Sequence, residues 1–331
     1  MNMVDPQLAP LSNDIKNDVK IDIKDNQFLK DVLQGLSQTN KTLPCKYFYD
    51  EKGSQLFEQI CELDEYYVTD TEIKLLQNNM SDIAKFIQPN CNIIEPGSGA
   101  GIKIQLLLSA LDQPKSFTAL EISPSALKYS VATIKKKYPA LEVNGLLGDF
   151  TDQENINKIK GSQGNNNLVF FPGSTIGNFE VDQAITVLKN LSSLAGDGQI
   201  LIGVDLIKPL NTMLEAYNDK KGITAAFNKN LLHRINSELN GQIEVEQNFK
   251  HQSIFNAEKS RIEMHLISKQ DHSIKVNGVD FHFKEGESVH TENSHKYSTT
   301  SFERLANLAG LKIKQSWYAP NKAFVLFLLE K

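Results

Sequence analysis

Residues 92–105 read NIIEPGSGAGIKIQ, an apolar run followed by an acid, a glycine-rich stretch and the start of a second apolar run. Three glycines stand at alternate positions between an acid and a lysine: Glu95, Gly97, Gly99, Gly101 and Lys103. The first apolar run predicts a strand, and glycines let the backbone turn sharply and approach a ligand closely. The stretch therefore predicts a cofactor-binding loop between a strand and a helix.

The spacing of the glycines distinguishes between three classes of cofactor. A dinucleotide fingerprint that starts at Gly97 requires glycine or alanine where the sequence has Ile102. A P-loop requires serine or threonine after its lysine, whereas Ile104 follows Lys103. The pattern acid-x-Gly-x-Gly-x-Gly at 95–101 is typical of methyltransferases that use S-adenosylmethionine, which is therefore the predicted co-substrate.

Acids stand at the ends of the next two predicted strands. Glu121, in TALEIS, comes about 20 residues after the last glycine of the loop, where a carboxylate can accept hydrogen bonds from both ribose hydroxyls. Asp149, in GLLGDF, can bind the adenine amino group, with Phe150 beside the ring. The order of loop and acids predicts one cofactor site. The alternatives are turn carboxylates without a ligand, or a nicotinamide dehydrogenase.

Strands and helices alternate through the middle of the chain. The predicted strands are 91–97, 116–123, 141–150, 167–175 and 198–207, and the predicted helices are 102–111, 124–139 and 181–195. This alternation predicts right-handed βαβ units in a parallel sheet that is covered on both faces. A helix at 298–310 and two strands within 313–330 complete the sheet. The predicted class is α/β, with the Rossmann-like sheet of a class I methyltransferase.

A second, smaller α+β lobe is predicted from the segments outside this alternation. After residue 208 a helical block is followed by alternating runs, in which Asn277-Gly278 predicts a hairpin turn. Before the sheet, Thr69 or Asp70 is placed to cap a helix, with Glu72 near the offset of a capping box. The predicted division is a tail at 1–25 that can hold one strand at 19–23, a cofactor domain at 71–207 and 296–331, and a substrate lobe at 26–70 and 208–295.

The composition narrows the class of protein further. The 331 residues are 40% hydrophobic and 23% charged with a net charge of −5, which suits a globular enzyme and gives no basic face for nucleic acid. The 3 cysteines lack CxxC spacing, the N-terminus lacks a signal-peptide pattern, and no segment reaches membrane-spanning length. We expect a cytoplasmic monomer. The 7 histidines show no zinc-binding spacing, so no metal is expected.

Several segments carry a family resemblance. They are YFYDEKGSQLFEQI at 47–60, PGSTIGNF at 172–179, LLHRINSEL at 231–239, RIEMHLIS at 261–268 and GESVHTENSHKYS at 286–298. The chain from about Leu43 onward resembles the histidine-specific Nα-methyltransferases of ergothioneine biosynthesis. This resemblance implies that the protein trimethylates the α-amino group of free L-histidine to give hercynine.

The resemblance also implies roles for individual residues. Those on the cofactor side are Gly97, Lys103, Glu121, Asp149 and Phe150, of which Glu121 departs from the aspartate that the family usually carries. On the substrate side, Asn178 and Tyr217 would hold the carboxylate, and Glu292 and Ser294 would bind the imidazole. Tyr67 would line the pocket, Met264 would pack against the imidazole, and Tyr49 would lie near the amine. Tyr49 and Tyr67 are the candidate catalytic residues.

The substrate-side residues other than the two catalytic candidates also have structural interpretations. Asn178 can cap the helix that begins near Glu180, Tyr217 and Met264 can be core or surface residues, and Glu292 and Ser294 can face solvent on an extended segment. A buried carboxylate at Glu292 needs a donor, which imidazole supplies and an indole or phenyl ring supplies poorly, so histidine is favoured as the substrate. The alternatives are another amino acid or amine such as a tryptophan derivative, a nicotinamide oxidoreductase, and a non-catalytic cofactor-binding regulator.

Overall fold

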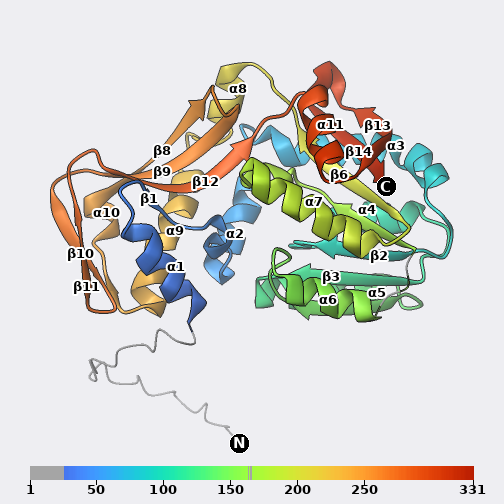
Figure 1. Ribbon diagram of the computed structural model, residues 1–331, viewed down its shortest axis with the longest axis horizontal. Helices are drawn as coiled ribbons and strands as arrows, with labels where there is room; N and C mark the ends of the chain where they lie inside the picture. The colour runs from blue at the N-terminus through green and yellow to red at the C-terminus, as the bar shows by residue number, and fades with distance from the viewer. Residues whose placement is uncertain (1–25, 163, 165) are drawn as a thin grey trace, which may run out of the picture.

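The computed structural model describes residues 26–331, apart from residues 163 and 165. The predicted tail at 1–25, with the strand considered at 19–23, lies outside these residues. No helix in the described part of the chain is long and apolar enough to cross a membrane. Figure 1 shows a large sheet and a smaller, curved sheet side by side, each with its own helices.

The large sheet contains the alternating strands that the sequence predicts. It has seven strands in the order β13-β14-β6-β5-β2-β3-β4. The strands are β2 (Asn92–Pro96), β3 (Ser116–Glu121), β4 (Glu142–Leu147), β5 (Asn167–Phe171), β6 (Gln199–Asp205), β13 (Lys312–Tyr318) and β14 (Phe324–Glu330). β2 to β6 are parallel, whereas β14 is antiparallel to both β6 and β13. The carboxyl ends of the five parallel strands therefore share one edge.

Both faces of the large sheet are buried, which explains its continuous apolar runs. The neighbours Ile93 and Ile94 are both fully buried, in two different core clusters. One cluster includes residues of α3 (Tyr67–Ile83), α4 (Ile102–Ala110) and α5 (Pro124–Lys137), and the other those of α6 (Gln153–Ser162), α7 (Val181–Ala195) and α11 (Thr299–Leu308). The apolar pattern did not predict α6, because most of its residues are polar and, among those whose burial is described, only Ile156 and Ile159 reach the core.

The remaining elements surround two small sheets. These are β1-β12-β9-β8 and β11-β10-β7. The strands are β1 (Lys41–Thr42), β7 (Gly241–Gln242), β8 (Phe249–Asn256), β9 (Arg261–Ser268), β10 (His272–Val276), β11 (Val279–Phe283) and β12 (Ser288–His295). The helices are α1 (Gln27–Leu36), α2 (Glu51–Cys61), α8 (Leu210–Glu215), α9 (Ile223–Glu238) and α10 (Val245–Asn248). The predicted hairpin is confirmed, since Val276 pairs with Val279 and both turn residues have positive φ.

The predicted cap at Thr69 or Asp70 is wrong. The helix α3 begins at Tyr67, and Tyr66 stands at its N-cap without a side-chain hydrogen bond. Glu72 makes no capping box but reaches toward the large sheet, as described below. Because α3 is one helix that packs against α4 and β14, the predicted boundary at residue 71 falls inside it. We propose the same two lobes with all of α3 in the cofactor domain.

Candidate active site

The loop after β2 has the backbone that its glycines allow. Gly97, Gly99 and Gly101 have φ angles of 72°, 50° and 71°. The Glu121 carboxylate at the end of β3 accepts hydrogen bonds from the Gly99 and Ser123 amides, both at 2.9 Å. A Cβ atom at Gly99 would meet no heavy atom within 4 Å, so the loop borders open space. The structure thus brings the loop and the predicted ribose acid together beside space that a cofactor can occupy.

A second group of charges lies behind this loop. The Lys103 ammonium lies 2.6 Å from the Glu72 carboxylate, which is fully buried and also accepts a hydrogen bond from the Gly173 amide at 2.8 Å. Glu95 is buried nearby, and one of its oxygens has no hydrogen-bond partner in the described part of the chain. Burial raises the pKa of Glu95 well above its usual range, and the charge of Lys103 opposes this shift. Lys103 therefore faces more than one acid.

Asp149 and Phe150 follow β4, next to the same loop. One Asp149 oxygen accepts hydrogen bonds from the amide and hydroxyl of Thr151, at 2.8 and 2.6 Å. The other lies 3.4 Å from the ammonium of Lys46, which comes from the 3₁₀ helix η1 (Cys45–Phe48) of the smaller lobe. The Phe150 ring lies 3.6 Å from the position of a Cβ atom on Gly97. An acid and an aromatic ring thus flank the glycine loop, as predicted for an adenine site.

Two strands of the smaller lobe bring the predicted imidazole-binding residues together. Glu292 of β12 pairs directly with Met264 of β9, after a bulge that follows His290. Ser294 lies two positions further along β12 and so on the same face of the strand. The Glu292 carboxylate has no hydrogen-bond partner among the residues described, and burial raises its pKa to about 8 although Lys296 opposes this shift. A half-buried acid without a donor is a site for a ligand that carries one.

Asp205, at the end of β6, is the centre of a buried ionic cluster. Its carboxylate lies 2.7 Å from the Lys296 ammonium and 2.5 Å from the Lys208 ammonium, and it accepts a hydrogen bond from the Tyr67 hydroxyl at 2.7 Å. Lys208 also donates to the Tyr67 oxygen at 3.0 Å. Burial disfavours the charge on Asp205, but Lys296 and Lys208 outweigh it and lower the pKa of this acid. The hydroxyl of Tyr67, which the sequence places in the pocket, is thus held by Asp205 and Lys208.

Lys296 connects this cluster to Tyr217 and Ser294. Its ammonium donates to the Ser294 oxygen at 2.8 Å and to the Tyr217 oxygen at 3.1 Å. The two hydroxyl oxygens lie 2.7 Å apart. Tyr217 lies in the turn after α8 rather than on the predicted helix. Its ring packs edge-on against the ring of Tyr66, with 6.0 Å between the ring centroids. The residues assigned to carboxylate and imidazole therefore meet at one ammonium.

Asn178 and Tyr49 lie near this region without hydrogen bonds of their own side chains to other described residues. Asn178 ends the 3₁₀ helix η3 (Thr175–Asn178), which packs against β12. It does not cap α7, because Glu180 and Gln183 form the capping box there. The ring of Tyr49 packs edge-on against Phe227, and burial, followed by the charge of Glu292, raises the pKa of its hydroxyl well above the usual range.

Four charged residues of this region were not predicted as site residues from the sequence: Glu72, Asp205, Lys208 and Lys296. Two of them had a recognisable signal. Asp205 ends a predicted strand, as Glu121 does, and Lys296 continues the alternation of Glu292 and Ser294 by two residues. Glu72 shows no such signal because its partners, Lys103 and Gly173, are distant in the chain. Lys208 shows none because it lies in the loop after β6.

Three side chains on the neighbouring strands β9 and β12 could hold a metal ion by distance alone. Glu263, His265 and His290 offer ligand atoms that all lie within 4.8 Å of one another. However, Arg261 lies 2.7 Å from Glu263, and His290 shares a hydrogen bond with the Glu292 carbonyl at 3.1 Å. Burial opposes the charge on Glu263, but Arg261 and His265 outweigh it and lower its pKa to about 2. The group is an ionic network that needs no metal for its charge balance.

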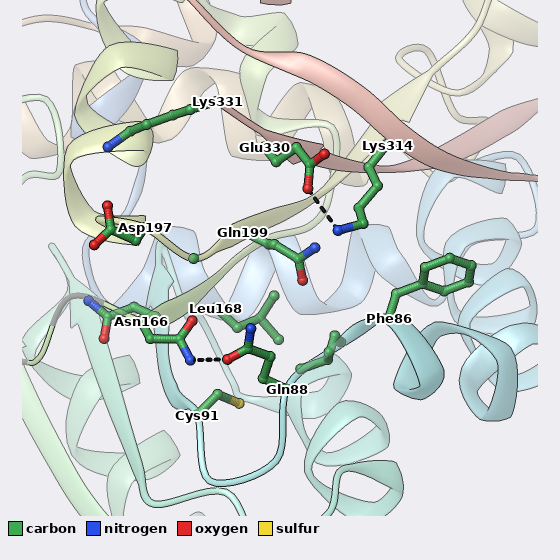
Figure 2. Close-up of a pocket in the computed structure, with 13 residues that line it drawn as sticks. Phe86, Gln88, Cys91, Asn166, Leu168, Asp197, Gln199, Lys314, Glu330 and Lys331 are labelled. Carbon is green, nitrogen blue, oxygen red and sulfur yellow. Dashed lines mark hydrogen bonds and ion pairs between the residues drawn. The ribbon is translucent and has the colours of Figure 1, made fainter.

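A cavity of about 340 Å³ lies at the opposite edge of the large sheet. Figure 2 shows that polar side chains line it, with hydrogen bonds between Asn166 and Gln88 and between Lys314 and Glu330. β2, β5 and β6 begin at this edge, so the cavity is far from the loops at their carboxyl ends. It contains none of the predicted site residues.

The strand order, the antiparallel β14 and the glycine loop after the first parallel strand define a class I methyltransferase that uses S-adenosylmethionine. A comparison with protein families makes the assignment more specific. The profile described as "Histidine-specific methyltransferase, SAM-dependent" matches residues 28–331. The chain belongs to this family.

Curated relatives agree with the family. A histidine N-alpha-methyltransferase of Mycolicibacterium smegmatis is 34% identical over 90% of this chain and 93% of its own. Ergothioneine biosynthesis protein 1 of Neurospora crassa is 34% identical over 88% of this chain but only 33% of its own length. The N-methyltransferase imqF of Aspergillus flavus is 27% identical, over 87% of this chain and 80% of its own.

Proposed function

We propose that the protein transfers methyl groups from S-adenosylmethionine to the α-amino group of free L-histidine, three times, to give hercynine for ergothioneine biosynthesis. The carboxylate of Glu292 carries this proposal, because it has no hydrogen-bond donor among the described residues and Ser294 lies beside it on the same strand face. The names and identities of the curated relatives support the same substrate.

On the cofactor side, S-adenosylmethionine supplies a methyl group that is made electrophilic by its sulfonium. We assign Glu121 to the ribose and Asp149 with Phe150 to the adenine. Lys103 would bind the cofactor carboxylate, since Glu72 uses only one of its three donors. The orphan oxygen of Glu95 and the open space beside Gly99 fit a ligand with several donors at this position.

On the substrate side, each end of histidine meets a matching group. Asn178 and Tyr217 would bind the α-carboxylate, and neither adds a negative charge. Glu292 would accept the imidazole N–H and Ser294 would contact the other ring nitrogen, with Met264 against the ring. An analogue without the imidazole N–H would leave the half-buried Glu292 carboxylate unpaired. We therefore expect the site to reject such analogues strongly.

The chain contributes orientation and desolvation to the reaction. A nitrogen lone pair must point at the methyl carbon, so the amine has to be neutral before each of the three transfers, and holding both ends of histidine supplies the alignment. Tyr49 and Tyr67 stay candidate catalytic residues near the amine. The phenol of Tyr67 keeps its proton, because burial and Asp205 raise its pKa far above the usual range.

A substrate panel tests the proposal. The purified protein would be incubated with S-adenosylmethionine and each of the twenty amino acids, plus histamine. We expect methylation of histidine and little of histamine. Methylation of a tryptophan derivative or another amine instead would keep the methyltransferase class and overturn the assignment of Glu292 to imidazole. The monomeric state and the cytoplasmic location stay predictions from the sequence, as does the absence of nucleic-acid partners.

A further inference from the structure

The ionic cluster around Asp205 has more positive than negative charge. Lys296 and Lys208 share the single carboxylate of Asp205, and the side chains of Lys296 and Asp205 are fully buried. Glu292, a further acid whose pKa burial raises to about 8, forms no ion pair with either lysine in the described part of the chain. Tyr67 and Tyr217 contact the two ammonium groups through their hydroxyl oxygens. Buried charges are ordinarily paired, so the cluster lacks one anion.

The hydrogen bonds of Lys296 fix the direction of the hydroxyls above it. An ammonium has three donors and no acceptor, and Lys296 uses them on Asp205, Tyr217 and Ser294. The oxygens of Tyr217 and Ser294 must therefore both accept from Lys296. In the free protein one of these hydroxyls then donates to the other, since the two oxygens lie 2.7 Å apart. The proton of the second hydroxyl stays available to an acceptor on the substrate.

We propose that Lys296 is the positioning residue that selects the substrate carboxylate. It supplies, together with Lys208, the unmatched positive charge that the carboxylate neutralises. It also makes Tyr217 a donor to that carboxylate and Ser294 a donor to the unprotonated ring nitrogen, while Glu292 accepts from the ring N–H. The inference rests on the proposed histidine methylation and extends it, because one ammonium then coordinates recognition of both ends of the substrate.

Replacement of Lys296 by methionine tests this role. Asp205 keeps Lys208 and the Tyr67 hydroxyl as partners, so the remaining ion pair is balanced. We expect the preference for histidine over histamine, measured as the ratio of kcat/KM values, to fall by about 30-fold or more, the scale for loss of a desolvated charge partner. The change should come from a higher KM for histidine, and the Kd of S-adenosylhomocysteine should stay within about twofold.

Lys208→Met is the matched variant, because it removes the same charge but leaves the donors to Tyr217 and Ser294 in place. We expect a smaller loss of preference from it. A preference that stays within about threefold of the wild type in Lys296→Met would overturn the proposal. If neither Lys296→Met nor Lys296→Gln binds S-adenosylhomocysteine, Lys296 is needed for the fold and the proposal is also overturned. Wild-type protein that leaves histidine unmethylated would instead contradict the proposed function itself.

Discussion

Lys103 and Glu72 form an ion pair at 2.6 Å between the helix after the glycine loop and the helix that precedes the large sheet. Gly203 of β6 makes room for this pair, because a Cβ atom there would lie 2.0 Å from a Glu72 oxygen. The Gly173 amide binds the same carboxylate, so Glu72 joins three segments around the cofactor loop. This relationship makes Glu72 a support of the cofactor site rather than a helix cap.

Glu72→Gln should therefore weaken both folding and cofactor binding. The amide can still bind near Gly173, but Lys103 loses its buried counter-charge, which typically costs about 3 kcal/mol or more. Chemical denaturation and calorimetric titration with S-adenosylhomocysteine would measure the two effects. Asp70→Asn is the control, since it breaks an exposed pair with Lys74 on the same helix and should cost below about 1 kcal/mol. Equal stability losses in the two variants would contradict the assigned role.

Glu292→Gln should reduce the apparent affinity for histidine with little effect on cofactor binding. A bound imidazole N–H favours the ionised form of Glu292, which glutamine cannot supply, and a charge-assisted hydrogen bond is worth about 2 kcal/mol, or roughly 30-fold in KM. Steady-state kinetics with histidine varied at saturating S-adenosylmethionine would measure this. Unchanged histidine kinetics would show that Glu292 does not read the ring.

Asn178→Ala should weaken binding of the α-carboxylate. The amide of Asn178 has no other side-chain partner among the described residues, so its removal should leave the fold intact and cost about 1 kcal/mol of substrate binding. The expected readout is a reduced preference for histidine over histamine. If the wild-type protein already turned over both compounds equally, a carboxylate-binding role for Asn178 would be untenable.

The raised pKa of Glu292 predicts a pH effect on stability. The carboxyl is expected to lose its proton near pH 4.5 when unfolded but only near pH 8 when folded. Across that window the unfolded state binds fewer protons, so this group lowers the free energy of unfolding as the pH rises. The Tm of the wild type should therefore fall relative to that of Glu292→Gln between pH 5 and pH 8. A constant difference in Tm over this range would mean that the buried acid is already ionised.

The sheet could be predicted from sequence because both of its faces are buried. Runs such as NLVFF must then be apolar at every position, and the glycine loop and strand-end acids stand out between them. The start of α3 could not be predicted, because Thr69 and Asp70 match a cap by type while packing of Tyr66 and its neighbours sets the real start. Local patterns favour a cap wherever the residue types allow one.

The candidate site was predictable only where a residue stands at a strand end or in an alternating run. Glu121 and Asp149 follow that rule: Glu121 binds the Gly99 amide, and Phe150, next to Asp149, lies against Gly97. Glu72 owes its position to contacts between distant segments, and Lys208 lies in a loop after β6 without a pattern of its own. Lys296 lies within the segment 286–298 that carries the family resemblance. A lysine in an extended segment is by default solvent-exposed, so only its burial in the structure indicates that it contacts other site residues.

The most direct test of the account is the identity of the product made from L-histidine. After reaction with excess S-adenosylmethionine, fragmentation mass spectrometry would locate the added methyl groups. We predict three methyl groups on the α-nitrogen and none on the imidazole, because Glu292 and Ser294 hold the ring away from the cofactor loop. Methyl groups on a ring nitrogen would contradict this orientation, and recovery of unchanged histidine would contradict the proposed function.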